Sequence, residues 1–475
     1  MNGSRRRAAL LALTALAASP AEAESPVTPA MRADMERLVG AAVTSSRAPE
    51  ILRSLTDSVG PRLSGSPGDR AAVAWGVATL RALGFSNVRA EKVLVPVWRR
   101  ISESASMTAP YPQSFAVAAL GGSVSTPDGG ITAEVVEAGS LAAVDALGEK
   151  ANGKIVFIWK TTERARDGHG YGETVPIRSA GAVRAAKLGA LAVLIRSVGT
   201  DDDRLPHTGA MSYDEKTPKI PAAALSTPDA DLLHRVLAEG RPVTVTLNLR
   251  TETGPDAESA NVVGEIPGRE MPGEIVLVGG HLDSWDLGPG AIDDGAGCAI
   301  AIEAARLIGA LPRRPRRTVR VVLFANEENG LRGGRTYAAE HAAELPRHAA
   351  AVEADAGADR AYGYSWNAGP GAEAFMKEMS AFLAGIGAGE FRKGGAGGAD
   401  ISPFLPSGLP LLGLRNDASR YFDVHHTAND TYDKVDPVQL NQATAALAAM
   451  TFALAEAVEP LPRIPLSDRA HRPPD

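Results

Sequence analysis

Two apolar runs with polar ends decide the fold: EIVLVGGHLD at residues 274–283 and TVRVVLFANEE at residues 318–328. Between them, residues 297–311 carry apolar side chains at helical spacing, and a second helical pattern follows at residues 332–341. Strands that alternate with helices predict an α/β domain, in which helices sandwich a parallel or mixed sheet. Such sheets bind ligands beyond the carboxyl ends of their strands.

The segments on either side extend this pattern. We expect helices at residues 30–43 and 69–83 and a strand at residues 88–98. A last helix, residues 438–458, begins after Asp436-Pro437, which is a favourable pair for the start of a helix. These segments therefore belong to the same α/β domain.

The middle of the chain has a different texture, with short β-like runs between glycine-rich connections and one helical segment at residues 178–188. We therefore predict a β-rich inserted domain over residues 106–252, between residues 24–105 and 253–475 of the main domain. In its loops, a solvated surface position is expected for His169, for His207 and for the three aspartates 201–203. The β-like runs are residues 133–138, 155–159, 192–195 and 243–249.

The N-terminus has the pattern of a secretory signal peptide over residues 1–23. Basic residues 5–7 precede a short apolar run, residues 8–18, and Ala21-Glu22-Ala23 has the small-x-small cleavage pattern. The apolar run is far shorter than the roughly 20 residues that span a bilayer. The sequence therefore predicts a periplasmic or secreted protein that has no membrane contact after the signal is removed.

Composition excludes several classes of protein. The chain has 475 residues, a net charge of −7 and 44% hydrophobic residues, which is ordinary for a soluble globular protein and gives no reason to expect nucleic acid as a partner. Its single cysteine, Cys298, permits no intramolecular disulfide and is expected to be buried among small apolar residues.

Five possible metal ligands follow one another in the second half of the chain. Nitrogen and oxygen donors without thiolate suit zinc in a hydrolytic site. One bridging carboxylate and two further ligands per ion would hold a pair of metals about 3.5–4 Å apart. The five residues are His281, Asp293, Glu328, Asp355 and His426.

Residues beside these ligands have complementary chemistry. Glu327 precedes a proposed ligand and is a candidate general base. Asp283 could accept the second imidazole N–H of His281, and Asp294 could cap the following helix or orient the site. His425 could bind metal itself or donate a hydrogen bond, and its residue type leaves both roles open.

The sequence resembles the co-catalytic di-zinc exopeptidases, a family that includes secreted leucyl aminopeptidases and glutamate carboxypeptidases. Within it the chain is most similar to the carboxypeptidase Q group. The resemblance covers about residues 52–460. It is carried by residues 60–65, 280–286, 293–297, 327–331, 399–401 and 423–431.

The resemblance implies two Zn2+ ions per chain, bridged by Asp293, and a protease-associated domain at about residues 106–250. His281 and Asp355 would complete one zinc site, and Glu328 and His426 the other. Glu327 would be the general base. His425 stands where some members carry a Tyr that hydrogen-bonds the developing oxyanion, so this role is implied for it only by analogy.

The sequence thus predicts an exported zinc-dependent exopeptidase that hydrolyses dipeptides or short peptides. The alternatives are a glutaminyl-cyclase-like zinc acyltransferase and a non-catalytic, receptor-like relative; a complete ligand set for two metals and an intact Glu327 count against both. A homodimer and the end of the peptide that is attacked both stay open. Four cations could hold a substrate carboxylate, although each is also typical of a surface charge: Arg332, Arg335, Arg392 and Arg415.

Overall fold

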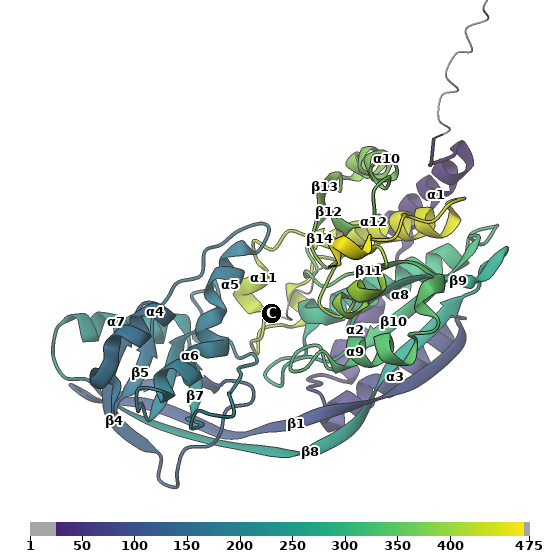
Figure 1. The fold of residues 1–475 in the computed structure, drawn as a ribbon. Coiled ribbons are helices and arrows are strands. Elements are labelled where there is room, and N and C mark those ends of the chain that lie inside the picture. The colour runs from purple at the N-terminus through teal and green to yellow at the C-terminus, as the bar shows by residue number, and fades with distance from the viewer. Residues whose placement is uncertain (1–24, 470–475) are drawn as a thin grey trace, which may run out of the picture.

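Two long antiparallel strands join the two parts of the molecule. The computed structural model describes residues 25–469. Strand β1 (Ser86–Ala109) pairs with β8 (Thr244–Ile266) along nearly their whole lengths, beneath both parts (Figure 1). One end of this ribbon lies in the main sheet, and the other end lies in a lobe formed by the segment between the two strands.

The main sheet is mixed and has the order β13-β12-β14-β11-β9-β10-β8. Strands β10, β9, β11 and β14 run parallel, whereas β12 and β8 run antiparallel to their neighbours β14 and β10. The strands are β9 (Met271–His281), β10 (Arg317–Phe324), β11 (His348–Glu353), β12 (Ala361–Asn367), β13 (Glu390–Lys393) and β14 (Leu411–Asn416).

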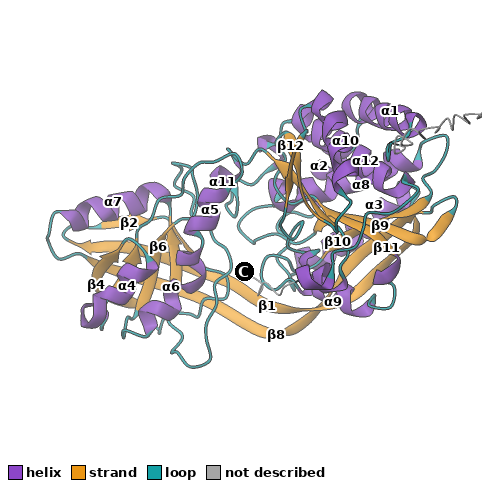
Figure 2. Ribbon diagram, turned by 45° about the horizontal axis from the view of Figure 1, so that its top comes forward, coloured by secondary structure: helices purple, strands orange, loops and turns teal. Residues whose placement is uncertain are grey.

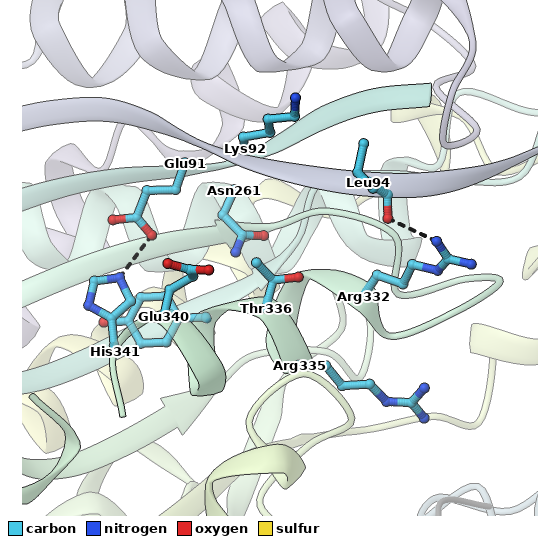
Figure 3. A pocket seen from close by; sticks show the side chains of 10 residues that line it. Glu91, Lys92, Leu94, Asn261, Arg332, Arg335, Thr336, Glu340 and His341 are labelled. Atoms are coloured by element: carbon cyan, nitrogen blue, oxygen red, sulfur yellow. Dashed lines mark hydrogen bonds and ion pairs between the residues drawn. The ribbon is translucent and has the colours of Figure 1, made fainter. Parts of the chain in front are cut away.

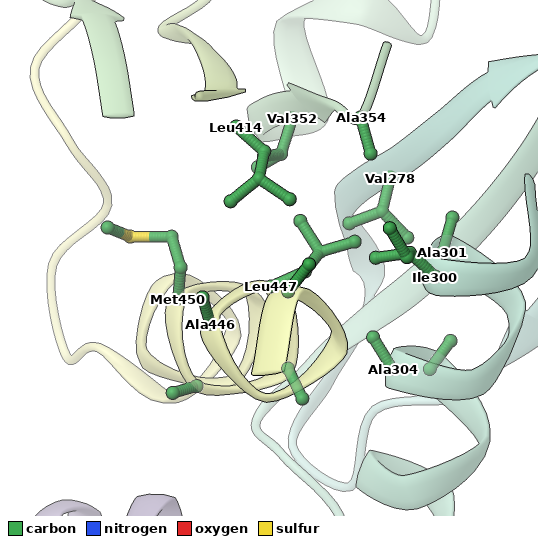
Figure 4. Close-up of a cluster of buried hydrophobic side chains, with 14 of the residues drawn as sticks. Val278, Ile300, Ala301, Ala304, Val352, Ala354, Leu414, Ala446, Leu447 and Met450 are labelled. Atoms are coloured by element: carbon green, nitrogen blue, oxygen red, sulfur yellow. The ribbon is translucent and has the colours of Figure 1, made fainter. Parts of the chain in front are cut away.

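Helices cover both faces of this sheet, as Figure 2 shows. Alternate residues of one strand enter different cores, since Val276 and Val278 of β9 pack with one helical layer and Leu277 packs with the other. In the larger core, Ile300 and Leu447 from two helices meet Val278 (Figure 4). The helices are α1 (Pro29–Ser45), α2 (Ala48–Ser58), α3 (Pro67–Ala82), α8 (Ala296–Gly309), α9 (Arg332–Glu340), α10 (Glu373–Leu383) and α12 (Pro437–Glu456).

The predicted elements of the main domain are present within a few residues of their expected limits. Ser66 caps α3 by accepting from the amide of Asp69, and Asp436 caps α12 by accepting from Val438. The strand predicted at residues 88–98 is much longer, because β1 continues into the lobe. The α/β sandwich predicted from the sequence is confirmed.

The lobe is a second α/β unit, so the prediction of a β-rich segment with a single helix is wrong. Its strands β4, β5, β6 and β7 are parallel, and alternate residues of β5 enter separate cores on the two faces. Two of the helices that were not predicted have only seven and six residues, which is too few to show a helical period. The elements are β2 (Gln113–Phe115), β3 (Val117–Ala119), β4 (Ile131–Ala138), β5 (Ile155–Ile158), β6 (Ala192–Arg196), β7 (Ala222–Leu225), α4 (Leu141–Leu147), α5 (His169–Thr174), α6 (Pro176–Ala186) and α7 (Thr227–Ala238).

The predicted domain limits, residues 105–106 and 252–253, fall inside β1 and β8 rather than between elements. The predicted signal peptide, residues 1–23, lies outside the described residues. Within residues 25–469, no helix has the length and apolar character needed to cross a membrane.

Candidate metal centre

Five polar side chains from separate segments meet at the carboxyl edge of the main sheet. His281 ends β9, Glu328 follows β10 and Asp355 follows β11. Asp293 lies in the turn before α8, and His426 lies in the loop after the short helix α11 (Tyr421–Val424). The structure therefore gathers all five residues that the sequence proposed as ligands.

Asp293 is at the centre of this group. One of its carboxylate oxygens lies 3.2 Å from Nε2 of His281, and the other lies 3.0 Å from Nε2 of His426. Asp355 lies 3.7 Å from Nε2 of His281, and Glu328 lies 3.0 Å from Nε2 of His426. Asp293 thus stands between two half-sites with the composition that the resemblance implies.

The chemistry of this group fits bound cations. The ligand atoms of His281, Asp293 and Asp355 all lie within 4.8 Å of one another. Burial, reinforced by neighbouring carboxylates, raises the pKa of Asp355 to about 6 and raises that of Glu328. Oxygen Oε1 of Glu328 is buried and has no hydrogen-bond partner among the described residues. Carboxylates crowded in this way are stable when cations neutralise them.

The turn before α8 is held from two sides. The Asp293–Asp294 peptide is cis. The carboxylate of Asp430 accepts from the amides of Ile292 (2.7 Å) and Asp293 (3.2 Å). Asp294 accepts from the amides of His281 (3.0 Å) and Gly297 (3.0 Å), so it both orients the site and caps α8, the two roles that its position suggested.

The contact predicted between Asp283 and His281 differs in detail. Nδ1 of His281 donates to the main-chain carbonyl of Asp283 at 3.0 Å, whereas the nearest carboxylate oxygen is 3.7 Å away. That carboxylate instead accepts from the amide of Glu327 (3.0 Å) and the hydroxyl of Ser64 (3.0 Å). Asp283 therefore fixes the ring of His281 through its backbone and the position of Glu327 through its side chain.

The segment Gly60-Pro61-Arg62 packs against the loop that follows His281, residues 282–290. Arg62 is fully buried, and its guanidinium donates to the main-chain carbonyls of Leu282, Pro289 and Gly290. Three carbonyls in one loop are thus held by one side chain. The sequence showed this motif only as part of the resemblance.

Glu327 lines the cleft without serving in either half-site. Burial raises its pKa well above the usual range, and the neighbouring carboxylates of Asp355 and Glu328 raise it further. A carboxylate in this position can take a proton from water and return it.

His425 and His426 lie with their rings stacked, at a centroid distance of 3.5 Å. Burial, followed by the neighbouring His426, lowers the pKa of His425 well below its usual range. Its Nε2 lies 3.2 Å from Asp293, and its Nδ1 is buried with no hydrogen-bond partner in residues 25–469. Since Asp293, His425 and His426 also form a compact donor set, both roles considered for His425 fit its position.

The lobe contributes contacts to the candidate centre that the sequence did not predict. His207 is 1% exposed, so the prediction of a solvated position is wrong for it, whereas His169 is exposed as expected. The residue after His207 is Thr208, and its main-chain carbonyl accepts from Nδ1 of His426 at 3.2 Å. That bond leaves Nε2 of His426 facing the carboxylates, which is the tautomer that binds metal. The sequence around Thr208 contains no recognisable motif, so this contact could not be predicted from it.

A cavity of about 570 Å³ opens at the centre between the lobe and the main sheet. From the lobe it is lined by Tyr171 and Arg178, and from the main domain by Glu327, Arg335 and the candidate ligands. Arg178 is 8% exposed, and its guanidinium donates to the main-chain carbonyls of Thr208 (3.4 Å) and Ala210 (3.3 Å) rather than to a described carboxylate.

The other proposed cations lie elsewhere. Arg332 pairs with Asp256, Arg392 is exposed on β13 and Arg415 stacks over Tyr362. A larger cavity of about 810 Å³ lies between β1 and α9, where Glu91 pairs with His341 (3.0 Å) and Arg332 donates to the carbonyl of Leu94 (Figure 3). Glu91, His341 and Arg332 are therefore already paired within the protein, and none of them is a candidate ligand.

Comparison with known proteins decides the family. Residues 261–451 match the profile of peptidase family M28. Carboxypeptidase Q of Mus musculus is 39% identical over 418 residues, which cover 88% of this chain and 87% of the mouse protein. The chain belongs to peptidase family M28. The crystal structure of a peptidase M28 precursor from Shewanella amazonensis is 46% identical with a TM-score of 0.90, and the match covers 92% of this chain and 99% of that one.

This member of family M28 is a metallo-exopeptidase, as the sequence predicted. A zinc aminopeptidase from Bacillus subtilis shares its fold, with a TM-score of 0.63, 23% identity and a match that covers 89% of this chain and 97% of the aminopeptidase. At that identity the likeness concerns the fold alone. The roles of individual residues therefore rest on the geometry of the candidate centre.

Proposed function

We propose that the chain is an exported exopeptidase that uses two zinc ions, bridged by Asp293, to hydrolyse dipeptides or short peptides. The observation that carries this proposal is the position of the Asp293 carboxylate, 3.2 Å from His281 and 3.0 Å from His426, with Glu327 beside both half-sites. His281 and Asp355 would complete one zinc site, and Glu328 and His426 the other. Export rests on the signal-peptide pattern of residues 1–23.

The residues of the chain divide the chemistry between them. Bound zinc ions would polarise the peptide carbonyl and lower the pKa of the attacking water. Glu327 would accept the proton of that water and deliver it to the leaving amine, a role that suits its position in the cleft beside both half-sites. A neutral His425 would donate a hydrogen bond to the oxygen that gains charge.

The cations of the cleft favour substrates with a free α-carboxylate. The carboxylates that line it are the candidate ligands and Glu327, so among the described residues no further acidic group faces a substrate ammonium. Arg178 is nearly buried there without a carboxylate partner in the described chain. A buried cation is stabilised by a compensating anion, and a substrate carboxylate would supply one. We therefore propose cleavage next to the carboxyl end, with Arg178 as the anchor.

The lobe limits what can reach the centre. Tyr171, Arg178 and residues 210–212 form one wall of the cavity, whose volume suits a small ligand. We propose that the lobe, which we interpret as a protease-associated domain over about residues 106–252, excludes folded proteins from the cleft. This arrangement favours exopeptidase over endopeptidase action.

The test is a product analysis on a free dipeptide, a free longer peptide and the same longer peptide blocked at its amino end, its carboxyl end or both. We expect hydrolysis of the free dipeptide, release of single residues from the carboxyl end, and no cleavage when the carboxyl end is blocked. Internal cleavage of the doubly blocked peptide would exclude the exopeptidase reading. A peptide that begins with Gln should give no cyclised product, which separates hydrolysis from acyl transfer.

A further inference from the structure

The main chain at His426 has a conformation that its surroundings must hold. Its φ of +63° lies in the left-handed region, which is costly for a residue other than glycine. Such a conformation persists where neighbouring groups over-determine it. Because His426 is a proposed metal ligand, whatever holds this segment also sets the direction of its ring.

Two residues of the lobe hold the segment at three points. The ring of His207 donates through Nδ1 to the carbonyl of His425 at 2.6 Å. The amide of Thr208 donates to the carbonyl of His426 at 3.1 Å, and the carbonyl of Thr208 accepts from Nδ1 of His426 at 3.2 Å. The two carbonyls and the ring of the strained segment are therefore all bound by residues 207–208.

His207 is itself fixed from several directions. Its Nε2 lies 2.7 Å from the carboxylate of Asp201, and its amide donates to Ser197 at 2.9 Å. The carbonyl of His425 and the carboxylate of Asp201 therefore face the two nitrogens of the ring from opposite sides of the contact. An added Cβ at Gly199 would lie 2.3 Å from Nε2 of His207, so glycine leaves just enough room for the ring.

Further contacts bring the same two segments together. The amide of Thr200 donates to the carbonyl of Phe422 (3.0 Å), and Arg164 pairs with Asp423 at 2.6 Å. These bonds lie on the outer side of the loop, where Arg164 is 46% exposed. Such a surface pair contributes little by itself, so the buried contacts of His207 and Thr208 are the ones expected to hold the segment.

We propose that His207, oriented by Asp201, is a positioning residue that holds the His425–His426 segment in its metal-binding conformation. This proposal rests on the proposed two-metal function. In it the lobe has a second role besides walling the cleft, because its loop completes the half-site that contains Glu328 and His426. The half-site of His281 and Asp355, which is built from the main sheet alone, does not depend on it.

The test compares His207→Ala with His207→Asn. The amide nitrogen of Asn can take the place of Nδ1 and donate to the carbonyl of His425, whereas Ala cannot. His234→Ala is the matched control, because His234 also pairs with a carboxylate in the lobe (Glu137, 2.9 Å) but stacks on Trp159 within the lobe. Three quantities are measured on each protein: zinc content during titration with a chelator, kcat and KM, and hydrogen exchange of residues 421–430.

In His207→Ala we expect one zinc ion to keep its affinity and the other to bind about 10–100-fold more weakly, the usual scale for loss of a group that orients a ligand. At limiting zinc, kcat should fall by a similar factor with little change in KM, and exchange of residues 421–430 should accelerate. His207→Asn should recover most of each loss, and His234→Ala should match the wild type.

Three outcomes would overturn the proposal. A folded His207→Ala that keeps both ions and wild-type exchange removes the positioning role. If His207→Ala and His207→Asn each lost both zinc ions to the same extent, the ring of His207 would only fill space. Unchanged exchange together with weakened zinc would place the effect outside this segment. If the wild type binds no zinc, the two-metal function fails, whereas faster exchange in His207→Ala alone would still show that His207 holds the segment.

Discussion

The main sheet and the lobe contribute to the centre in different ways. The sheet supplies His281, Glu328 and Asp355 directly from strand ends, and Asp293 from the turn before α8. In the proposed assignment the lobe supplies no ligand, yet its loop binds the ring of His426 and the carbonyls on both sides of it. The ligands thus come from one unit of the fold, while the orientation of one ligand depends on the other unit.

Metal removal is expected to have the largest effect, because the chemistry proposed for both half-sites depends on the bound ions. Dialysis against a chelator should abolish peptide hydrolysis, and zinc should restore it. Elemental analysis of the purified protein should give close to two equivalents per chain. Full activity in metal-free protein would contradict the whole assignment.

Exchanging Glu327 separates the base from the ligands. Glu327→Gln should keep both metals, because Glu327 belongs to neither half-site, and should lower kcat by about 10²–10⁴, the scale of a lost general base. Glu328→Ala is the matched comparison and should lose one metal. Wild-type turnover in Glu327→Gln would remove the proposed role from this residue.

Arg178 tests whether the lobe selects the substrate. A charge-assisted hydrogen bond contributes about 1.5–3 kcal/mol, so Arg178→Ala should raise KM for a free dipeptide by about ten- to a hundredfold. The preference for the free peptide over its C-terminal amide should shrink by the same factor. Arg332→Ala, which removes a cation already paired with Asp256, is the control and should leave KM unchanged. An intact preference in Arg178→Ala would place the carboxylate elsewhere.

The ligands could be predicted from the sequence because each lies at the end of a strand-like run or in a loop and has a side chain of the right chemistry. The contacts that orient them could not be predicted, because many involve main-chain atoms. The carbonyl of Asp283 binds His281, and that of Thr208 binds His426. Such bonds leave no trace in residue type. For the same reason His207 looked like a surface residue until the fold placed it against His425.

Helix α6 was predicted at residues 178–188, but the other helices of the lobe were missed for a different reason. Helices α4 and α5 have seven and six residues, which is too short for a clear helical period. Helix α7 has the polar residues Thr227 and Asp229 among its buried positions, which weakens its apolar pattern. Strand β8 was divided between two expected units, because its middle residues, Arg250–Glu258, are largely exposed while its two ends are buried in different cores.

The smallest expected effect on turnover concerns the independence of the two units. Leu194 in the lobe and Leu447 in α12 are both fully buried, so Leu194→Ala and Leu447→Ala should each destabilise the protein by about 2–5 kcal/mol. Neither residue lines the cleft, so kcat at 25 °C should stay close to that of the wild type. Calorimetry then distinguishes two cases. Because β1 and β8 run through both units and the lobe loop binds the His425–His426 segment, we expect one transition whose midpoint falls in both variants. A separate early transition in Leu194→Ala alone, with the remainder unchanged, would show that the lobe unfolds by itself and that its hold on His426 is looser than these contacts imply.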